Sequence, residues 1–276
     1  MANYPELKGR VVVITGAGRR QGLGEAIARR LGSEGCKVVL SDIGKPAGEY
    51  LPEGAIGTSD EMEAIAAELR ADGIDVATCV CNMLHEEQVE ALAAFAVDTF
   101  GSLDIWVNNA GVGYLMKALV DTDAAEWDTV LGVNLRGVFL GIKHAGRNMI
   151  KQGGGRIINI GSQASKSAFA EAGAYTTSKH GVVGLTRVAA KELGTHGINV
   201  NAICPNHVTT GLGAWQNNRF ANGDLDSYMS EMRARIPLGR PGLQSDTANA
   251  CAFLCSDQSV YITGESMNVS GGEEYH

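Results

Sequence analysis

Short, nearly continuous apolar runs separated by longer amphipathic stretches make up most of the chain. Seven of these runs predict strands, over residues 10–15, 36–41, 76–81, 103–108, 156–160, 198–204 and 265–269. Continuous rather than alternating apolar runs are typical of a parallel sheet that is covered on both faces. The stretches between them have the length and helical pattern that parallel crossovers need, beginning with a helix over 25–33. We therefore predict an α/β fold in one domain, residues 1–276, with a parallel sheet of about seven strands and helices on both faces.

One segment departs from this alternation. Residues 43–57, IGKPAGEYLPEGAIG, are rich in Gly and Pro and show no periodicity, which predicts an extended surface loop. A helix should follow it, with Thr58 as N-cap and Glu61 completing a capping box, and should end at Gly73.

Composition narrows the class of protein. Lys and Arg number 23 against 31 Asp and Glu, a net charge of -8, which weighs against binding to nucleic acid or to anionic membranes. The first residues contain no apolar signal core, and no apolar run approaches the ~20 residues of a membrane span. The six cysteines are scattered in apolar contexts, as reduced core thiols are, and predict no metal site. We expect a soluble, cytoplasmic protein.

A glycine-rich loop, TGAGRRQGLG, follows the first predicted strand and precedes a helix. Glycine lets the backbone approach a pyrophosphate closely, and a helix N-terminus offers unpaired N–H groups with a partial positive charge. Strand, loop and helix in this order predict a dinucleotide site on a Rossmann-like, doubly wound sheet.

Two features of the sequence bear on which dinucleotide binds. Asp42 ends the second predicted strand, where an acidic residue accepts hydrogen bonds from a ribose 2′-OH and repels a 2′-phosphate, so it favours NAD. Arg19 and Arg20 in the loop favour NADP instead, because guanidinium groups pair well with phosphate. We give more weight to Asp42, because its contact follows from its place at the strand end.

A tyrosine and a lysine four residues apart begin a later helical stretch, Tyr175-Thr-Thr-Ser-Lys179. Residues at this spacing share one helix face, so the ammonium can sit near the phenol. A free tyrosine has a pKa near ~10, and a nearby cation lowers that value toward one that suits a general base. The pair is common by chance and carries little meaning alone.

Further motifs accompany this pair. Asn108-Asn-Ala-Gly111 closes the fourth predicted strand, Asn134 lies in NLRGVF, and Ser162 follows the strand RIINIG. Together with the glycine loop they resemble the short-chain dehydrogenase/reductase superfamily, in its single-domain branch, over nearly the whole chain.

The resemblance implies a role for each motif. Tyr175 would be the general acid/base, Lys179 would lower its pKa and hold the nicotinamide ribose, Ser162 would bind the substrate oxygen, and Asn134 would hold a relay water. The expected cofactor contacts are Gly16, Arg20, Gln21, Gly22, Leu23, Gly24, Asp42, Asn82, Met83, Asn109, Ala110, Gly111, Tyr175, Lys179, Pro205, Val208 and Thr210. Members of this superfamily are usually tetramers, so we expect a homo-oligomer, a tetramer or a dimer.

The chain departs from the family pattern at four places. Its glycine loop is two residues longer than usual, which leaves the contacts of Arg19, Arg20 and Gln21 open. Asn82 stands where an Asp usually contacts adenine, and Asn206 stands where a Gly usually follows Pro205. The 43–57 loop is longer than usual and lies at the adenosine end, so we expect it to affect cofactor binding or assembly.

The substrate is less well defined. Residues 206–240 should form a substrate-binding loop or lid, and the expected substrate contacts are Tyr114, Gln163, Asn206, His207 and Trp215. We predict an NAD-dependent oxidoreductase that interconverts a small-molecule secondary alcohol and a ketone. Two alternatives stay open: an NADPH-dependent ketoreductase, such as a 3-oxoacyl carrier-protein reductase, and a non-catalytic nucleotide-binding protein on the same fold.

Overall fold

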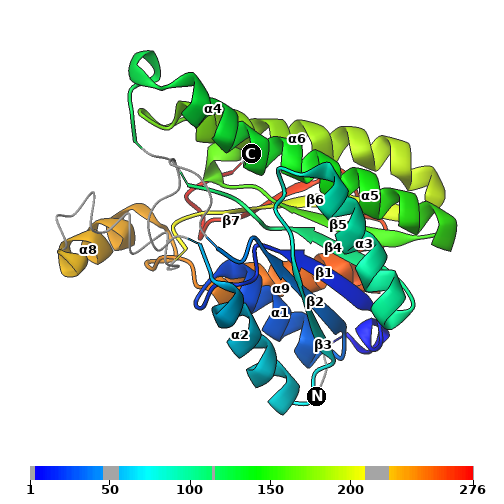
Figure 1. Ribbon diagram of the computed structural model, residues 1–276. Coiled ribbons are helices and arrows are strands. Elements are labelled where there is room, and N and C mark those ends of the chain that lie inside the picture. The colour runs from blue at the N-terminus through cyan, green and yellow to red at the C-terminus, as the bar shows by residue number, and fades with distance from the viewer. Residues whose placement is uncertain (1–3, 46–55, 114–115, 209–223, 276) are drawn as a thin grey trace.

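The computed structural model describes residues 4–45, 56–113, 116–208 and 224–275 (Figure 1). Its strands are β1 Val11–Thr15, β2 Lys37–Asp42, β3 Val76–Val80, β4 Ile105–Asn108, β5 Gly155–Ile160, β6 Ile198–Pro205 and β7 Ser266–Val269. Its longer helices are α1 Leu23–Ser33, α2 Ser59–Ala71, α3 Glu86–Phe100, α4 Ala124–Leu131, α5 Gly137–Gln152, α6 Gly173–Leu193, α8 Leu225–Arg235 and α9 Gln244–Cys255.

The strands form one parallel sheet in the order β3-β2-β1-β4-β5-β6-β7, so the predicted doubly wound α/β fold is confirmed. The order reverses between β1 and β4. A crevice opens at such a reversal, outside the carboxyl ends of the strands, and ligands of open α/β sheets bind there.

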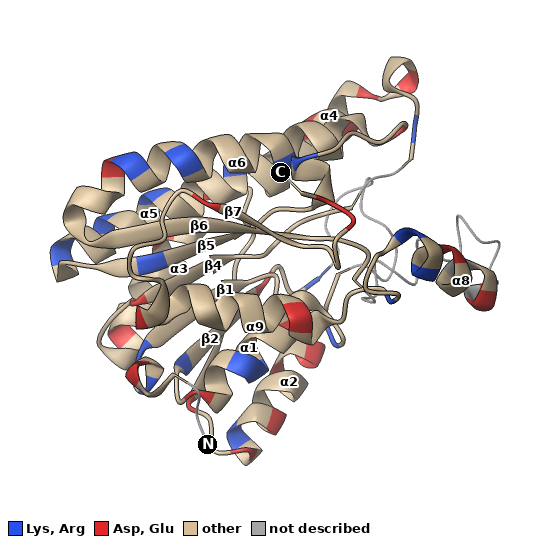
Figure 2. Cartoon of the chain, turned by 180° about the vertical axis from the view of Figure 1, so that it is seen from behind, with Lys and Arg blue, Asp and Glu red and all other residues tan. Residues whose placement is uncertain are grey.

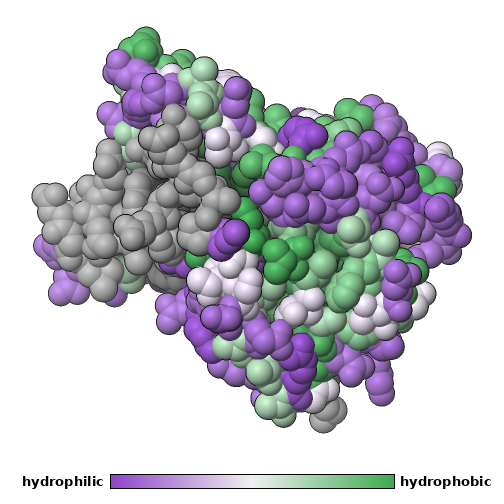
Figure 3. Space-filling view, viewed as in Figure 1, coloured by the Kyte–Doolittle hydropathy of each residue, from purple (hydrophilic) through white to green (hydrophobic). Residues whose placement is uncertain are grey.

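Successive side chains of a strand point to opposite faces of the sheet, so apolar residues throughout a strand fill two cores. In β1, Val12 and Ile14 pack with α1, α2 and α9 on one face. Val11 and Val13 pack with α3, α5 and α6 on the other face. The helices lie above and below the sheet in Figure 1, and Figure 2 shows charged residues mainly on the helices and at the strand ends. On the face seen in Figure 3, hydrophilic residues border a central apolar region.

The helix after the 43–57 loop begins as predicted with Thr58 as its N-cap, but Glu61 does not complete the predicted capping box. The Thr58 hydroxyl accepts a 3.1 Å hydrogen bond from the Glu61 amide. The Glu61 carboxylate, however, accepts from the backbone amide of Arg20, at 2.8 Å. The start of α2 is therefore tied to the glycine loop, a contact between distant segments that local sequence spacing does not reveal.

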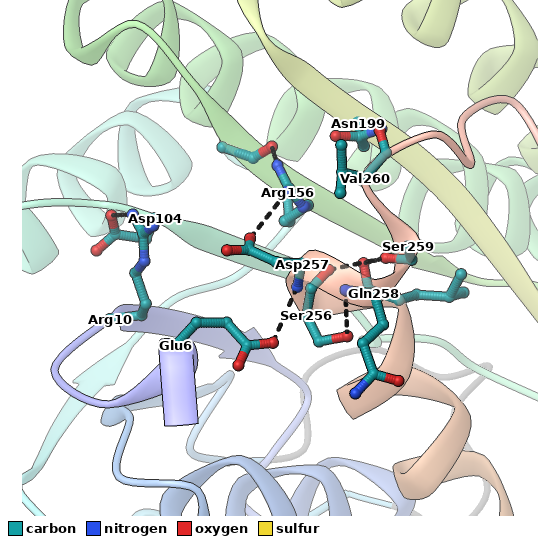
Figure 4. A network of polar contacts seen from close by, with 12 residues as sticks. Glu6, Arg10, Asp104, Arg156, Asn199, Ser256, Asp257, Gln258, Ser259 and Val260 are labelled. Carbon is teal, nitrogen blue, oxygen red and sulfur yellow. Dashed lines mark hydrogen bonds and ion pairs between the residues drawn. The ribbon is translucent and has the colours of Figure 1, made fainter. Parts of the chain in front are cut away.

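A polar network holds together the amino-terminal ends of the strands (Figure 4). Arg10 pairs with Asp104 at 3.0 Å, which joins the starts of β1 and β4. The Asp257 amide donates to Glu6 at 3.0 Å, and the Asp257 carboxylate lies 3.5 Å from Arg156 at the start of β5. These contacts lie at the opposite end of the strands from the crevice, so they support the sheet without entering the site.

Candidate active site

A cavity of about 720 Å³ opens at the carboxyl ends of the strands. Most of the residues predicted from the sequence line it: Gly16, Gly22, Leu23, Asp42, Asn82, Met83, Asn109, Ala110, Gly111, Ser162, Gln163, Tyr175, Lys179, Pro205, Asn206, His207 and Val208. Arg20, Gln21, Gly24 and Asn134 are not among the lining residues. Tyr114, Thr210 and Trp215 lie outside the described residues.

The glycine loop comes too close to its neighbours for side chains. Gly16 has φ +65°, and a Cβ there would lie 2.6 Å from the Ala110 Cα. A Cβ on Gly24 would lie 2.6 Å from the Gly16 carbonyl oxygen, so Gly24 lets α1 pack under the loop. The loop thus presents bare backbone and the start of α1 to the cavity, which fits a pyrophosphate and a nicotinamide dinucleotide.

Asp42 is bound to the glycine loop. Its carboxylate accepts hydrogen bonds from the amides of Gly18 and Ile43, both at 2.8 Å. Burial raises the pKa of Asp42, and these two amides act in the opposite direction. Asp42 lines the cavity, and a carboxylate oxygen can accept more than one hydrogen bond, so Asp42 can still receive a ribose hydroxyl.

The two loop arginines have different surroundings. The Arg20 guanidinium is bound to Glu68 of α2 at 2.6 Å, and hydrogen bonding to that carboxylate raises the Arg20 pKa. Arg19, like Asp42, lines the cavity, whereas Arg20 does not. Of the two, Arg19 is therefore the one placed at the adenosine end, whereas our sequence-based set of contacts contained Arg20.

Thr15, which the sequence did not single out, joins the two halves of the sheet. Its hydroxyl accepts hydrogen bonds from the amides of Asn109 and Ala110, at 3.1 and 3.0 Å, and donates to the Val107 carbonyl at 3.3 Å. The Asn109 side chain donates to the carbonyls of Thr15 and Gly16, at 2.8 and 2.9 Å. The cavity floor is therefore one hydrogen-bonded unit of β1 and β4.

Ser162 and Tyr175 both line the cavity, and their side chains share a hydrogen bond. Ser162 follows β5, where its hydroxyl accepts from the Ala164 amide at 3.1 Å. A side-chain hydrogen bond with Ser162 lowers the pKa of Tyr175, but burial has the larger effect and raises it overall. The direction is opposite to the lowering by Lys179 that the sequence predicted, because a buried phenolate loses its hydration.

Lys179 lies one helical turn beyond Tyr175 on α6. Its Nζ is 5.6 Å from the centre of the Tyr175 ring and donates a 2.8 Å hydrogen bond to the Ile160 carbonyl. Burial lowers the pKa of Lys179 to about 8. The predicted pairing of the two side chains along one helix face is therefore present, with the ammonium held by the end of β5.

Asn134 lies behind this pair, in a π-helical turn, Gly132–Arg136, that joins α4 to α5. Such turns are frequent at functional sites. The Asn134 amide nitrogen donates to the Val112 carbonyl at 2.9 Å and to the Ser178 hydroxyl at 3.3 Å, and its oxygen accepts from the Val112 amide at 2.8 Å. Its side chain thus fixes the segment after β4 against α6, and its role in holding a relay water stays a prediction.

At the adenine end, the Asn82 side chain is partly used within its own turn. Its oxygen accepts from the Leu84 amide at 3.0 Å. The cavity wall here also contains Ile43, Ile56 and Gly57, which flank the undescribed part of the long loop. A Cβ on Gly57 would lie 2.1 Å from the Gly18 carbonyl oxygen, so the end of the 43–57 loop rests directly on the glycine loop. No local motif marked Gly57 as part of the site.

At the substrate end, Gln163, Asn206 and His207 line the cavity, as do Met232 and Arg235 of α8. Figures 1 and 2 show α8 standing apart from the helix layers. The Asn206 amide nitrogen donates to the carboxylate of Glu273, a residue near the end of the chain that the sequence did not single out. The side chain that replaces the usual glycine is thus directed toward Glu273.

Two kinds of feature are absent from the described residues. No group of three or more His, Cys, Asp or Glu among them is arranged to hold a metal ion. None of the helices in the described part of the chain is both long and apolar enough to cross a membrane.

Comparison with known proteins agrees with this geometry. A family model described as enoyl-(acyl carrier protein) reductase matches residues 16–274. A short-chain dehydrogenase/reductase of Armillaria gallica is 39% identical over 274 residues, 99% of this chain and 98% of that protein. NAD+-bound xylitol dehydrogenase is 30% identical with a TM-score of 0.86, covering 97% of this chain and 100% of that one. Actinorhodin polyketide ketoreductase with NADPH is 32% identical with a TM-score of 0.87, covering 100% of both chains.

A match of this extent, on a chain whose Ser162, Tyr175 and Lys179 meet beside a glycine-loop cavity, settles the family. The protein belongs to the short-chain dehydrogenase/reductase family, nicotinamide-dependent oxidoreductases that act on alcohols and ketones.

Proposed function

We propose that the protein is an NAD-dependent dehydrogenase that interconverts a secondary alcohol and a ketone. The observation that carries this proposal is the placement of Asp42 at one end of the cavity and of Ser162, Tyr175 and Lys179 farther along it. Asp42 favours NAD at the adenosine end, and the other three supply proton transfer at the reacting end.

The bound cofactor supplies the hydride acceptor or donor and, when oxidised, a positive charge. The Tyr175 phenolate takes the proton of the substrate hydroxyl during oxidation, and the phenol returns it during reduction. Ser162 donates a hydrogen bond to the substrate oxygen, which becomes more negative as its proton leaves during oxidation and as the new C–H bond forms during reduction. The Lys179 ammonium stabilises the phenolate, since it lies on the same helix face.

Asp42 supports NAD by two effects. Its carboxylate, fixed by the amides of Gly18 and Ile43, can accept from the ribose hydroxyls without reorientation. The same negative charge repels a 2′-phosphate. Arg19 favours the alternative, an NADPH-dependent ketoreductase, because it lines the same cavity as Asp42 and a guanidinium pairs well with phosphate.

The test is a titration of the purified protein with NADH and, separately, with NADPH, followed by nicotinamide fluorescence at matched ionic strength. We expect NADH to bind at least about tenfold more tightly, a difference of about 1.4 kcal/mol. Tighter NADPH binding would reject the cofactor assignment and favour ketone reduction.

The variants Arg19→Ala and Arg20→Ala form a matched pair for this titration. Arg19→Ala should weaken NADPH binding more than NADH binding. Arg20→Ala should change neither affinity appreciably, because its guanidinium is exposed and bound to Glu68. If Arg20→Ala weakens NADPH binding more than NADH binding, the Arg20 side chain contributes to the cofactor site.

We also propose that the protein is a homo-oligomer, a dimer or a tetramer, that uses α5 and α6. Phe139 of α5 and Val188 of α6 are 45% and 53% exposed, large values for apolar side chains. Gly141 of α5 faces the sheet rather than a partner subunit, because a Cβ there would lie 2.0 Å from the Asn108 side chain of β4. Sedimentation of Val188→Glu should show smaller species than the parent protein.

The free state of all six cysteines is compatible with a reducing compartment such as the cytoplasm.

A further inference from the structure

Glu273 lies beside the substrate end of the cavity, where it contacts two hydrogen-bond donors and the ring of His207. Its carboxylate accepts from the Asn206 amide nitrogen and pairs with Arg235 at 2.8 Å. Nε2 of His207 lies 3.4 Å from the same carboxylate, within ion-pair distance, and is buried without a hydrogen bond. The Glu273 side chain is only 11% exposed, so this carboxylate is largely screened from solvent.

His207 lies near this carboxylate and also lines the cavity. It is one of the lining residues, together with Ser162 and Tyr175, whereas Glu273 is not. His207 has φ +43°, a left-handed conformation that costs an ordinary residue roughly 1–2 kcal/mol. The backbone therefore maintains an unfavourable conformation that places an imidazole at the cavity wall.

The surroundings of His207 determine its protonation and its tautomer. Burial lowers the pKa of His207, and Arg235 acts in the same direction, against the opposing effect of Glu273 and Glu231. Burial thus favours the neutral ring over the imidazolium. An ionised carboxylate can only accept hydrogen bonds, so the ring proton belongs on Nε2, which leaves the lone pair on Nδ1.

We propose that Glu273 is a positioning residue that holds His207 as the Nε2–H tautomer, so that Nδ1 accepts a hydrogen bond from a second hydroxyl of the substrate. The substrate class is then alcohols that carry a further hydroxyl, such as diols and hydroxy ketones, rather than plain hydrocarbon alcohols. The inference rests on the proposed function only for the identification of the ligand as the enzyme's substrate.

Histidine ¹⁵N NMR tests the tautomer without any substrate. The His207 resonances are assigned by their loss in His207→Gly, since glycine accepts the positive φ without strain. In the parent protein we expect a protonated, pyrrole-type Nε2 and an unprotonated, pyridine-type Nδ1. The opposite tautomer would overturn the proposal.

Glu273→Gln should invert this tautomer. Arg235 is charged and retains the oxygen of the introduced amide, which turns its NH₂ group toward Asn206 and His207. The Asn206 amide can rotate to present its oxygen to one N–H of this group, and Nε2 of His207 becomes the acceptor of the other. Glu274→Gln is the matched control, because it removes a charge from the adjacent residue, whose side chain instead bonds Ser167. Retention of Nε2–H in Glu273→Gln, or an equal change in Glu274→Gln, would contradict the assigned role.

Cyclohexanol and cis-1,2-cyclohexanediol test the ligand class. With the NADH-loaded protein, the diol should move the Nδ1 resonance upfield and cyclohexanol should leave it in place. With NAD, kcat/KM for the diol should exceed that for cyclohexanol by about tenfold, as expected for one buried acceptor that the simple alcohol leaves unpaired. His207→Gly should abolish this preference.

The outcomes separate the two proposals. If neither alcohol is oxidised while the tautomer and the diol-induced shift are as stated, the proposed function fails and the assignment of His207 stands. If both alcohols are oxidised with equal kcat/KM, or the diol produces no shift, the assignment of His207 fails and the proposed function stands.

Discussion

The Gly18 amide donates a 2.8 Å hydrogen bond to the Asp42 carboxylate, which ties the glycine loop to the end of β2. Gly18 has no room for a side chain there, because a Cβ would lie 2.7 Å from the Asp42 Cβ. The residue that we propose selects the cofactor thus also shapes the glycine loop.

Asp42→Ala should therefore weaken NADH binding by about tenfold or more, since the ribose loses its acceptor and the loop loses a fixed contact. NADPH binding should improve relative to NADH, because the repulsion of the 2′-phosphate is removed. Fluorescence titration measures both affinities, and Asp98→Ala, at an exposed acid on α3, is the control. An unchanged NADH/NADPH ratio would contradict the role of Asp42.

Tyr175→Phe should reduce kcat by about 10³-fold through loss of the acid/base group. NADH affinity should change little, because the ring is retained. Steady-state kinetics and fluorescence titration separate the two effects. The control is Tyr261→Phe, at a fully exposed ring. Turnover near that of the parent enzyme would exclude Tyr175 as the proton donor and acceptor.

Lys179 predicts how stability depends on pH. Burial lowers its pKa in the folded protein to about 8, from an ordinary value of 10.5. Between these two values the unfolded chain binds the proton and the folded chain releases it, so the folded state gains stability as pH rises. Relative to Lys179→Met, the parent protein should gain about 1.4 kcal/mol of unfolding free energy per pH unit in this window.

Urea unfolding of both proteins from pH 8 to pH 9.5 measures this difference, and the comparison cancels the titration of groups that the two proteins share. Below pH 8 the difference should become constant, since both states of Lys179 are then protonated. If the unfolding free energy of the parent protein relative to Lys179→Met stays constant or falls as pH rises, the Lys179 ammonium is not buried.

Gly57→Ala tests the contact between the long loop and the glycine loop. The new Cβ would lie 2.1 Å from the Gly18 carbonyl oxygen, so the backbone must move, at a cost of about 1–3 kcal/mol. We expect weaker NADH binding and a lower Tm. Gly194→Ala is the control, because the space around Gly194 is open and its φ is -58°. If both variants change NADH affinity and Tm equally, the contact of Gly57 with the glycine loop has no specific role in cofactor binding.

The sequence predicted the parts of the protein that depend on local patterns. The buried strands follow from continuous apolar runs such as Val11–Thr15, and the relation between Tyr175 and Lys179 follows from helix geometry. Thr58 caps α2 as its residue type predicts. Each of these depends only on neighbouring residues.

Other features depend on pairings between distant segments, which one sequence does not reveal. Glu61 binds the Arg20 amide and Glu273 binds Asn206, across separations of 41 and 67 residues. The pKa of Tyr175 was predicted with the wrong sign, because burial depends on the assembled core rather than on the spacing to Lys179. The sequence also does not reveal which of the adjacent Arg19 and Arg20 lines the cavity, because this depends on the ion pair between Arg20 and the distant Glu68.

The hydrogen bonds that join Thr15 to Asn109 and Ala110 have a consequence for folding. They connect residues 94 and 95 positions apart, so loop-closure entropy opposes their formation until the strands before β4 have assembled. A partly folded chain would then show native helix content by circular dichroism before the hydrogen bonds between β1 and the segment after β4 complete the cofactor cavity. Cofactor fluorescence during refolding should consequently report when the two halves of the sheet have docked.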